Sequence, residues 1–167
     1  MPSRCALARQ FGIEQTLDCP PQEQVAALKA LTGGRGVDIA ADATGASPAI
    51  ANALMSCGKY GQVILLSSPR APFSGELTPL LSAIHMNMLR VTGAFNSLDP
   101  VYETEGSRVC VERNYRVICG LLSRGELDVR ALISHVIRPA QVQDAYYGLM
   151  YDKENYHCVV IDWTDPV

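Results

Sequence analysis

VDIAADATG, at residues 37–45, is a mainly apolar run, interrupted by Asp38 and Asp42, that closes on a threonine and a glycine. An apolar run with so little alternation of polar residues is typical of a strand that is covered on both faces. Such strands occur in parallel sheets, where a helix crosses over from each strand to the next. The run therefore predicts an α/β fold built on a parallel sheet.

The segments on either side of this run alternate between helical and strand patterns. We expect helices at 3–11, 21–31, 49–57, 80–86, 107–124 and 141–151. We expect strands at 13–17, 37–43, 62–67, 88–95, 134–138 and 157–163. No linker, internal repeat or low-complexity tract divides the chain, so we expect a single domain over residues 1–167, with helices on both faces of its sheet.

The 167 residues are 48% hydrophobic and carry a formal net charge of −3, which is typical of a packed globular chain. No cluster of Lys and Arg favours nucleic acid or a membrane surface as a partner, and no apolar run could span a membrane. The N-terminal residues lack a signal-peptide pattern. The six cysteines have scattered spacings without C-x-x-C, which favours buried free thiols in a reducing cytoplasm over disulfides or zinc ligands.

Three of the expected strands end in small or polar residues. These ends are DATG at 42–45, LSSP at 66–69 and TGAF at 92–95. In an open α/β sheet, ligands bind at the carboxyl ends of the strands, and small residues there let a cofactor approach the backbone closely. The alternative is that Gly45 and Gly93 only shape tight turns, and both interpretations stay open.

Two other patterns do not predict a catalytic or metal site. The TGGRG run at 32–36 ends a helix and precedes a strand, whereas a phosphate-binding loop follows a strand and opens a helix. His85, His135 and His157 lack the spacing of a zinc motif and have no accompanying Cys or acidic cluster. We interpret them as structural or surface residues, and we assign no catalytic residue and no metal ligand.

Six stretches of the chain together carry a family resemblance. They are RCALARQFGIEQTLD at 4–18, LTGGRGVDIAADATG at 31–45, GKYGQVILLS at 58–67, LRVTGA at 89–94, LLSRGELDVRALISH at 121–135 and CVVIDW at 158–163. In their order and spacing they resemble the C-terminal half of the medium-chain, zinc-type alcohol dehydrogenase family, and the resemblance covers nearly the whole chain.

The resemblance implies NAD or NADP as cofactor, hydride transfer between an alcohol or carbonyl compound and the nicotinamide, and zinc as the metal of the family. The positions that it implies for cofactor binding are Arg4, Thr44, Gly45, Leu66, Ser67, Gly93 and Ala94. Thr44 and Gly45 match positions beside the adenosine half, and the last four match positions near the nicotinamide end. Arg4 matches a basic residue that reaches the adenosine ribose or a 2′-phosphate, the alternative being a solvated arginine at a helix start.

In the family, the first two strands, the glycine turn and the zinc ligands all precede the position that Arg4 matches. We therefore expect a partial Rossmann-like parallel sheet with flanking helices, in which the first two strands of the parent domain are absent. The strand at 13–17 would then lack a neighbour, and the strand at 37–43 would form an open apolar edge. Without the phosphate cradle and the metal, we expect the chain alone to be inactive.

Two alternatives to part of a dehydrogenase stay open. One is a non-catalytic module that self-associates into a homo-oligomer through its sheet edges, because unpaired edges invite pairing with another chain. In the family, the strand that matches 88–94 is commonly an edge between subunits. The other alternative is one half of a split enzyme, whose separate partner chain carries the glycine turn and the zinc lobe.

Overall fold

The computed structural model describes residues 1–70, 72–107 and 109–164. They form two compact units: a middle unit, Cys19–Val111, and a terminal unit that joins Met1–Asp18 to residues 112–164. Whether the two units together form the single domain expected over residues 1–167 stays a prediction.

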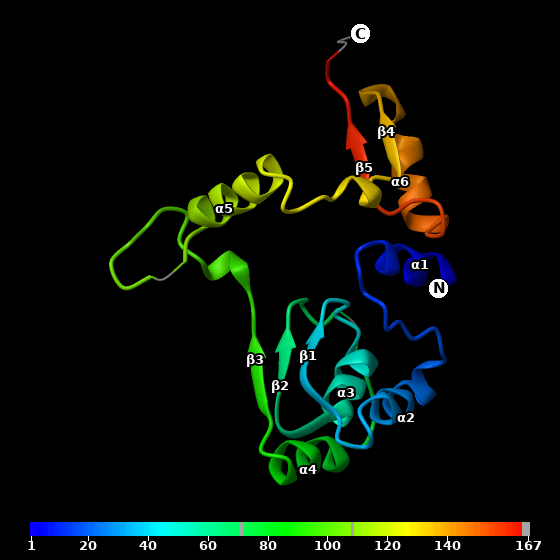
Figure 1. The fold of residues 1–167 in the computed structure, drawn as a ribbon, viewed down its shortest axis with the longest axis vertical. Coiled ribbons are helices and arrows are strands. Elements are labelled where there is room, and N and C mark those ends of the chain that lie inside the picture. The colour runs from blue at the N-terminus through cyan, green and yellow to red at the C-terminus, as the bar shows by residue number, and fades with distance from the viewer. Residues whose placement is uncertain (71, 108, 165–167) are drawn as a thin grey trace. The chain divides into compact units, whose positions relative to one another are not determined.

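The middle unit is a parallel sheet with helices between its strands (Figure 1). Its strands are β1 (Val37–Asp42), β2 (Cys57–Leu65) and β3 (Arg90–Gly93), which lie in that order in the sheet. Its helices are α2 (Pro21–Leu31), α3 (Ser47–Ser56) and α4 (Thr78–Met86), followed by a short 3-10 helix, η1 (Asn96–Leu98). Both strand pairs are parallel, which confirms the predicted α/β fold.

The core of the middle unit lies between the sheet and two of its helices. Val63 of β2 is fully buried, and Leu54 of α3 and Leu89 are nearly so. Leu80 and Ile84 of α4 pack against this cluster. Burying an aliphatic side chain of this kind contributes about 1.5–3 kcal/mol, so these contacts hold α3 and α4 to the sheet.

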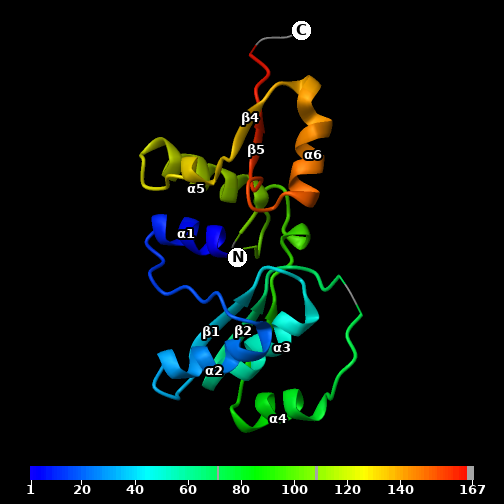
Figure 2. The same ribbon diagram turned by 90° about the vertical axis from the view of Figure 1, so that its right-hand side faces the viewer.

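Helices α2 and α3 lie on one side of the middle-unit sheet (Figure 2), and α4 packs against the same core cluster. Val63 pairs in register with Ala40 of β1, so both side chains point toward α3. The preceding residue of β1, Ile39, points to the opposite face, where it is 63% exposed. The expectation of helices on both faces is therefore wrong for this unit. Successive right-handed crossovers that advance in one direction along a sheet place their helices on the same side.

β1 lies at one end of the three-stranded sheet and has β2 as its single neighbour among the described residues. The predicted open apolar edge at 37–43 is thus confirmed for the part of the chain that the structure describes.

α3 passes into β2 without a loop, because Ser56 is the last residue of the helix and Cys57 the first of the strand. A Cβ added to Gly36 would lie 2.6 Å from the Gly58 nitrogen, and one added to Gly58 would lie 2.4 Å from the Arg35 carbonyl oxygen. The helix expected at 49–57 and the strand expected at 62–67 are both present, but the helix ends at Ser56 and the strand begins at Cys57. The first residues of β2 pair irregularly with β1, so they lack the pattern of a regular strand.

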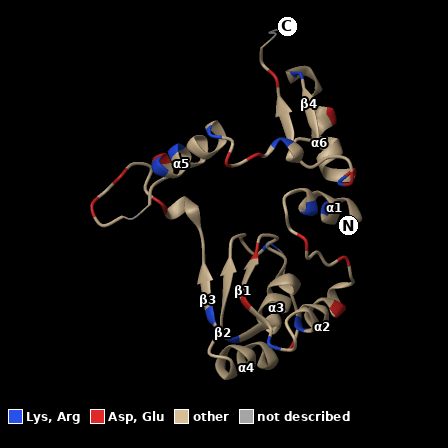
Figure 3. Ribbon diagram, in the orientation of Figure 1, with Lys and Arg blue, Asp and Glu red and all other residues tan. Residues whose placement is uncertain are grey.

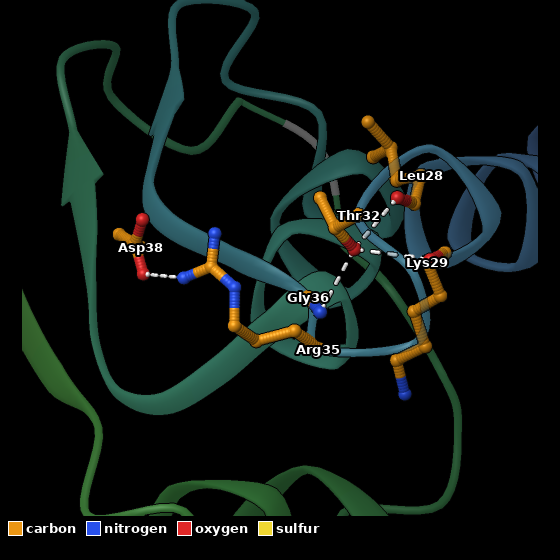
Figure 4. A network of polar contacts seen from close by, with 6 residues as sticks. All are labelled: Leu28, Lys29, Thr32, Arg35, Gly36 and Asp38. Atoms are coloured by element: carbon orange, nitrogen blue, oxygen red, sulfur yellow. Dashed lines mark hydrogen bonds and ion pairs between the residues drawn. The ribbon is translucent and has the colours of Figure 1, made fainter.

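The TGGRG run at 32–36 closes α2 and turns the chain into β1 (Figure 4). The Thr32 hydroxyl lies 3.1 Å from the Leu28 carbonyl oxygen and 3.0 Å from that of Lys29. The same hydroxyl accepts a hydrogen bond from the Gly36 N–H at 2.9 Å. The run is a helix end and a turn, as predicted, and not a phosphate-binding loop.

The terminal unit combines helices with a two-stranded parallel sheet. Its strands are β4 (His135–Ile137) and β5 (Val159–Ile161). Its helices are α1 (Pro2–Gln10), α5 (Val111–Ser123) and α6 (Val142–Tyr151), with short 3-10 helices η2 (Arg130–Leu132) and η3 (Pro139–Gln141). No helix in the described part of the chain is both long and apolar enough to cross a bilayer.

Two further elements expected from the sequence, at 13–17 and 107–124, differ in the structure. Residues 13–17 form no strand, because no described segment pairs with them, and an isolated strand has no partner for its backbone hydrogen bonds. The helix expected at 107–124 begins at Val111. The Ser107 hydroxyl donates to the Val109 carbonyl, a local turn that competes with a helix. Residue 108 of that expected helix lies outside the described residues.

None of the six cysteines, all of which lie among the described residues, forms a disulfide. Cys57 and Cys110 are buried, whereas Cys119 and Cys158 are exposed. The expectation of buried thiols is therefore wrong for these last two, which lie on an outward side of α5 and just before β5.

Candidate functional site

The carboxyl ends of β1, β2 and β3 lie at one edge of the middle-unit sheet (Figure 1). Parallel pairing aligns Asp42 with Leu65, and Leu65 with Gly93. The segments that follow these three residues therefore leave the sheet side by side. Ligands bind at this edge in open α/β sheets, and the three strand ends predicted from the sequence are brought together there.

A buried carboxylate organises the first of these strand ends. Asp42 is 4% exposed, and its Oδ1 accepts hydrogen bonds from the Thr44 N–H at 3.2 Å and the Thr44 hydroxyl at 2.6 Å. Its Oδ2 accepts the Gly45 N–H at 2.9 Å. Burial by itself would raise the pKa of Asp42, but the hydrogen bonds from Thr44 and Gly45 outweigh it and hold the pKa below its usual value. Asp42 is thus an ionised anchor for the turn.

The second strand end is tied to the first through backbone groups. The Asp42 carbonyl oxygen accepts hydrogen bonds from the Leu66 N–H at 2.9 Å and the Ser67 N–H at 3.3 Å. Gly45 has a φ of 67°, and a Cβ added there would lie 2.3 Å from the Ser68 carbonyl oxygen. Gly45 is therefore required both for its left-handed backbone and for the close approach of the neighbouring turn.

Asp42 is a site residue that the sequence reasoning did not single out. Its signal is present in the pattern D-x-T-G at 42–45, because an aspartate two or three residues before free backbone N–H groups forms an Asx turn. The Asp42 carboxylate is buried at the end of a mainly apolar strand, where an unpartnered charge would be costly.

A cavity of about 690 Å³ opens beyond the ends of β2 and β3. Its lining residues are Leu66, Gly93, Ala94, Phe95, Asn96, Leu98 and Asp99. Three of the predicted cofactor residues, Leu66, Gly93 and Ala94, therefore share one wall. Ser67 lies on the adjoining turn and is not among the lining residues. Asn96, Leu98 and Asp99 were not predicted, because nothing in their sequence pattern separates them from an ordinary loop.

Arg4 belongs to the terminal unit, whereas the six other predicted residues belong to the middle unit. Its Nη2 donates hydrogen bonds to the Lys153 carbonyl oxygen at 3.0 Å and the Tyr156 carbonyl oxygen at 3.3 Å. These contacts hold α1 to the segment that follows α6. The role of Arg4 toward a cofactor stays a prediction.

The histidines do not gather into a site in the described part of the chain. His135 stacks on Tyr156 with ring centroids 3.9 Å apart and planes within 9°. No group of three His, Cys, Asp or Glu side chains among the described residues is placed to hold a metal ion. Lys and Arg residues are spread over several elements, with acidic residues between them (Figure 3).

The strand ends leave room for a flat ring beyond β2 and β3, but they offer no cradle for a phosphate beyond β1. The cavity beyond β2 and β3 falls within the range of about 300–1,000 Å³ that is usual for ligand pockets. A Cβ added to Gly93 would meet no atom within 4 Å, so the backbone is open there to a flat ring. The turn from β1 to α3, by contrast, has one glycine, and its Thr44 and Gly45 N–H groups are already donated to the Asp42 carboxylate. That turn offers no cradle for a phosphate.

Comparison with curated proteins finds L-threonine 3-dehydrogenases among the relatives. The enzyme of Bacillus velezensis is 26% identical over 132 residues, which are 79% of this chain and 34% of that protein. The enzyme of Rhizobium etli is 24% identical over 162 residues, which are 97% of this chain and 41% of that protein. The chain thus spans well under half the length of these relatives.

Solved structures of alcohol dehydrogenases contain the same fold. Benzyl alcohol dehydrogenase from Acinetobacter calcoaceticus matches with a TM-score of 0.76 at 19% identity, over 96% of this chain and 40% of that one. An alcohol dehydrogenase from Thermotoga maritima matches with a TM-score of 0.71 at 19% identity, over 97% of this chain and 41% of that one.

The family model described as zinc-binding dehydrogenase matches residues 1–111, which is well over half of the chain. This match confirms the resemblance to zinc-type alcohol dehydrogenases that the strand-end segments predict. The chain belongs to the zinc-binding dehydrogenase family.

Proposed function

We propose that this chain forms the nicotinamide side of an NAD(P)-binding site in an oxidoreductase. The reaction is hydride transfer between an alcohol or carbonyl compound and the nicotinamide ring, which accepts or gives up the hydride when it is bound. The observation that carries the proposal is the cavity that brings Leu66, Gly93 and Ala94 onto one wall at the carboxyl edge of the sheet. Membership of the zinc-binding dehydrogenase family supports it.

In this proposal the lining residues orient the ring and do not react with it. Leu66 offers an apolar surface, and Gly93 leaves room for the ring beside the backbone. The Ala94 N–H is donated to the Leu65 carbonyl oxygen at 2.9 Å. Ala94 would therefore meet a ring substituent, such as a carboxamide NH₂, with its carbonyl oxygen. Ser67 remains a proposed neighbour of the same end of the cofactor.

Thr44, Gly45 and Arg4 remain proposed neighbours of the adenosine half. The Thr44 hydroxyl donates to Asp42 and accepts the Ala46 N–H at 3.0 Å, so it is already engaged within the turn. We infer that the exposed Thr44, in a turn shaped by the buried Gly45, would lie against a ribose or adenine. The choice between NAD and NADP would depend on residues that contact the 2′ position, for which Arg4 is the candidate.

We assign no step of the reaction to zinc. The described residues contain no set of three side chains placed to hold a metal ion, so they do not fit the metal named in the family description. Any zinc in the enzyme would be held by other residues. We propose accordingly that this chain by itself does not turn over an alcohol substrate.

The test of this proposal separates binding from turnover. Reduced cofactor, NADH or NADPH, is titrated into the purified chain while its fluorescence is recorded. In parallel, the zinc-supplemented chain is assayed with alcohols and NAD or NADP at 340 nm, the absorbance of reduced nicotinamide. Binding without turnover is the expected result. Absence of binding would refute the cofactor role, and measurable turnover would refute the inactivity of the chain alone.

We propose self-association through the sheet edges as a second role. It is favoured by the exposed Ile39 side chain at the β1 edge and by β3, whose four residues are all exposed. A groove of about 320 Å³ also runs along β1, with Leu28 of α2 and Asn52 of α3 in its lining. Light scattering over a concentration series tests this role, since a mass that stays monomeric at every concentration contradicts it.

We also propose a cytoplasmic location, which the free thiols support. Exposed thiols such as Cys119 and Cys158 persist in a reducing compartment and are oxidised outside it. Cell fractionation that recovers the protein from an oxidising compartment would contradict this location.

A further inference from the structure

The lining of the cavity beyond β2 and β3 carries negative charge and no positive charge. Of its seven lining residues, Asp99 is the one with an ionisable side chain, and the lining contains neither Lys nor Arg. A carboxylate in a partly enclosed wall favours a cation in the space that it faces and disfavours an anion. A phosphate group is therefore a poor occupant of this cavity, which agrees with assigning it to the nicotinamide end.

Asp99 is held in the wall by the backbone around it. Its N–H donates to the Asn96 carbonyl oxygen at 3.0 Å, which closes the 3-10 turn of η1. The next residue, Pro100, accepts the Val111 N–H on its carbonyl oxygen at 2.9 Å. Asp99 is half-buried and belongs to none of the ion pairs found among the described residues. Its charge is therefore not cancelled by a neighbouring cation that the structure describes.

The two redox forms of the nicotinamide differ in charge, and a nearby carboxylate interacts differently with each. The oxidised ring carries a positive charge, whereas the reduced ring is neutral and has nearly the same size. Contacts with Leu66, Gly93 and Ala94 would serve both forms about equally. A fixed negative charge, by contrast, stabilises the oxidised form alone.

We propose that Asp99 sets the preference of this site for oxidised over reduced nicotinamide, a role that rests on the proposed cofactor function. By binding the oxidised form more tightly, it would make the bound cofactor a weaker hydride acceptor than the same cofactor without the carboxylate nearby. Because Asp99 is partly solvated, the preference that it adds is expected to be about 3-fold, within the range of partly exposed charge pairs.

The test compares the affinities of the two redox forms in matched variants. NADH or NADPH is titrated by fluorescence into the full chain, and the oxidised form is titrated by displacement. The variants are wild type, Asp99→Asn, and Glu103→Gln as control, since Glu103 is an exposed acid of the same loop and is outside the cavity lining. Thermal unfolding of each variant checks that the fold is retained.

We expect Asp99→Asn to weaken binding of the oxidised form about 3-fold and to leave the reduced form nearly unchanged. Glu103→Gln is expected to leave both affinities unchanged, and added salt to narrow the difference between wild type and Asp99→Asn. If both forms bind wild type but the ratio of their affinities is the same in Asp99→Asn, the role of Asp99 is refuted and the cofactor function stands. If neither form binds wild type, both proposals fail.

Discussion

The buried Asp42 carboxylate accepts a hydrogen bond from the Thr44 hydroxyl at 2.6 Å in the turn at the end of β1. Together with the Gly45 N–H on the other carboxylate oxygen, this bond makes the charged form of Asp42 part of the folded structure.

Asp42→Asn is expected to lower the free energy of unfolding at pH 7 by about 1–3 kcal/mol, because the new amide group would face the Gly45 N–H as a donor. The pKa of Asp42 is lowered in the folded state. Its contribution is therefore fully present above the unfolded pKa of about 3.9 and is lost as the pH falls through the lower, folded pKa. Urea unfolding of both proteins between pH 7 and pH 3 measures the difference, which should shrink toward the acid end.

The control for this experiment is Asp38→Asn in the same strand. Asp38 is exposed and pairs with Arg35 at the surface, so its loss should change the free energy of unfolding by no more than about 0.5–1 kcal/mol. If the two variants lose the same free energy of unfolding, the hydrogen bonds of Asp42 stabilise the fold no more than a surface ion pair does.

Gly45→Ala is expected to destabilise the middle unit by about 2–4 kcal/mol, since it combines a left-handed backbone with a clash against a backbone carbonyl. The clash is with the Ser68 carbonyl oxygen, which would lie 2.3 Å from the new Cβ. Gly93→Ala is the matched control, because a Cβ there meets no atom within 4 Å. Thermal unfolding should separate the two variants clearly, and a similar melting temperature for both would contradict the role given to Gly45.

Gly93→Leu is expected to weaken NADH binding about 10-fold or more, because a large side chain would project into the cavity that the ring needs. The open space around Gly93 lets the side chain enter without disturbing the core. Gly120→Ala, in α5 of the terminal unit, serves as a glycine control that does not touch the cavity. Fluorescence titration gives the affinities. If Gly93→Leu binds NADH as tightly as wild type, this cavity does not bind the cofactor.

The pKa of Asp128 is lowered to about 2, first by side-chain hydrogen bonds from Arg130 and then by the Arg130 N–H. Arg130→Gln removes the charged partner, so the pKa of Asp128 should rise toward the usual value of about 3.9. NMR titration of the carboxyl carbon measures it. Both groups are exposed at the surface, so the change in stability is expected to be small, and a pKa that stays near its wild-type value would show that the Arg130 side chain is not its cause.

Ile39→Lys is expected to reduce any self-association that uses the β1 edge, because a lysine on an edge strand opposes pairing with another chain. Val136→Lys in β4 is the control, since Val136 is similarly exposed in the other unit. Light scattering at matched concentrations compares them. If both variants associate as strongly as wild type, the β1 edge is not the interface.

Much of the middle unit could be predicted from local pattern. The apolar run at 37–43 indicated a parallel sheet, and the strand ends near Gly45 and Gly93 lie together because parallel register aligns carboxyl ends. The beginning of β2 could not be predicted, since Cys57 and Gly58 pair there only through the close approach of Gly36. Contacts of that kind join residues far apart in sequence, and no local periodicity encodes them.

The sequence pointed to the glycines of the candidate site, Gly45 and Gly93. It did not point to the two aspartates, Asp42 and Asp99. Small residues at strand ends are visible in a sequence, because their spacing follows the strands. The hydrogen bonds of Asp42 and the place of Asp99 in the cavity wall depend on how turns close in three dimensions. The prediction of a strand at 13–17 was wrong for a similar reason. A strand needs a neighbouring strand to pair with, and the local sequence does not show whether one is present.

The direct passage from Ser56 of α3 to Cys57 of β2 decides where the chain tolerates added residues. One residue inserted at that junction would shift β2 by one position, and the period of two in a strand would turn Val63 from the core to the bare face of the sheet. The loop between β2 and α4 has no such register to keep, and lengthening it costs only a fraction of a kcal/mol, about 0.6 for each doubling. A reporter tag or grafted peptide therefore belongs near Ser74 and Gly75, where the fold can absorb it without moving a single core contact.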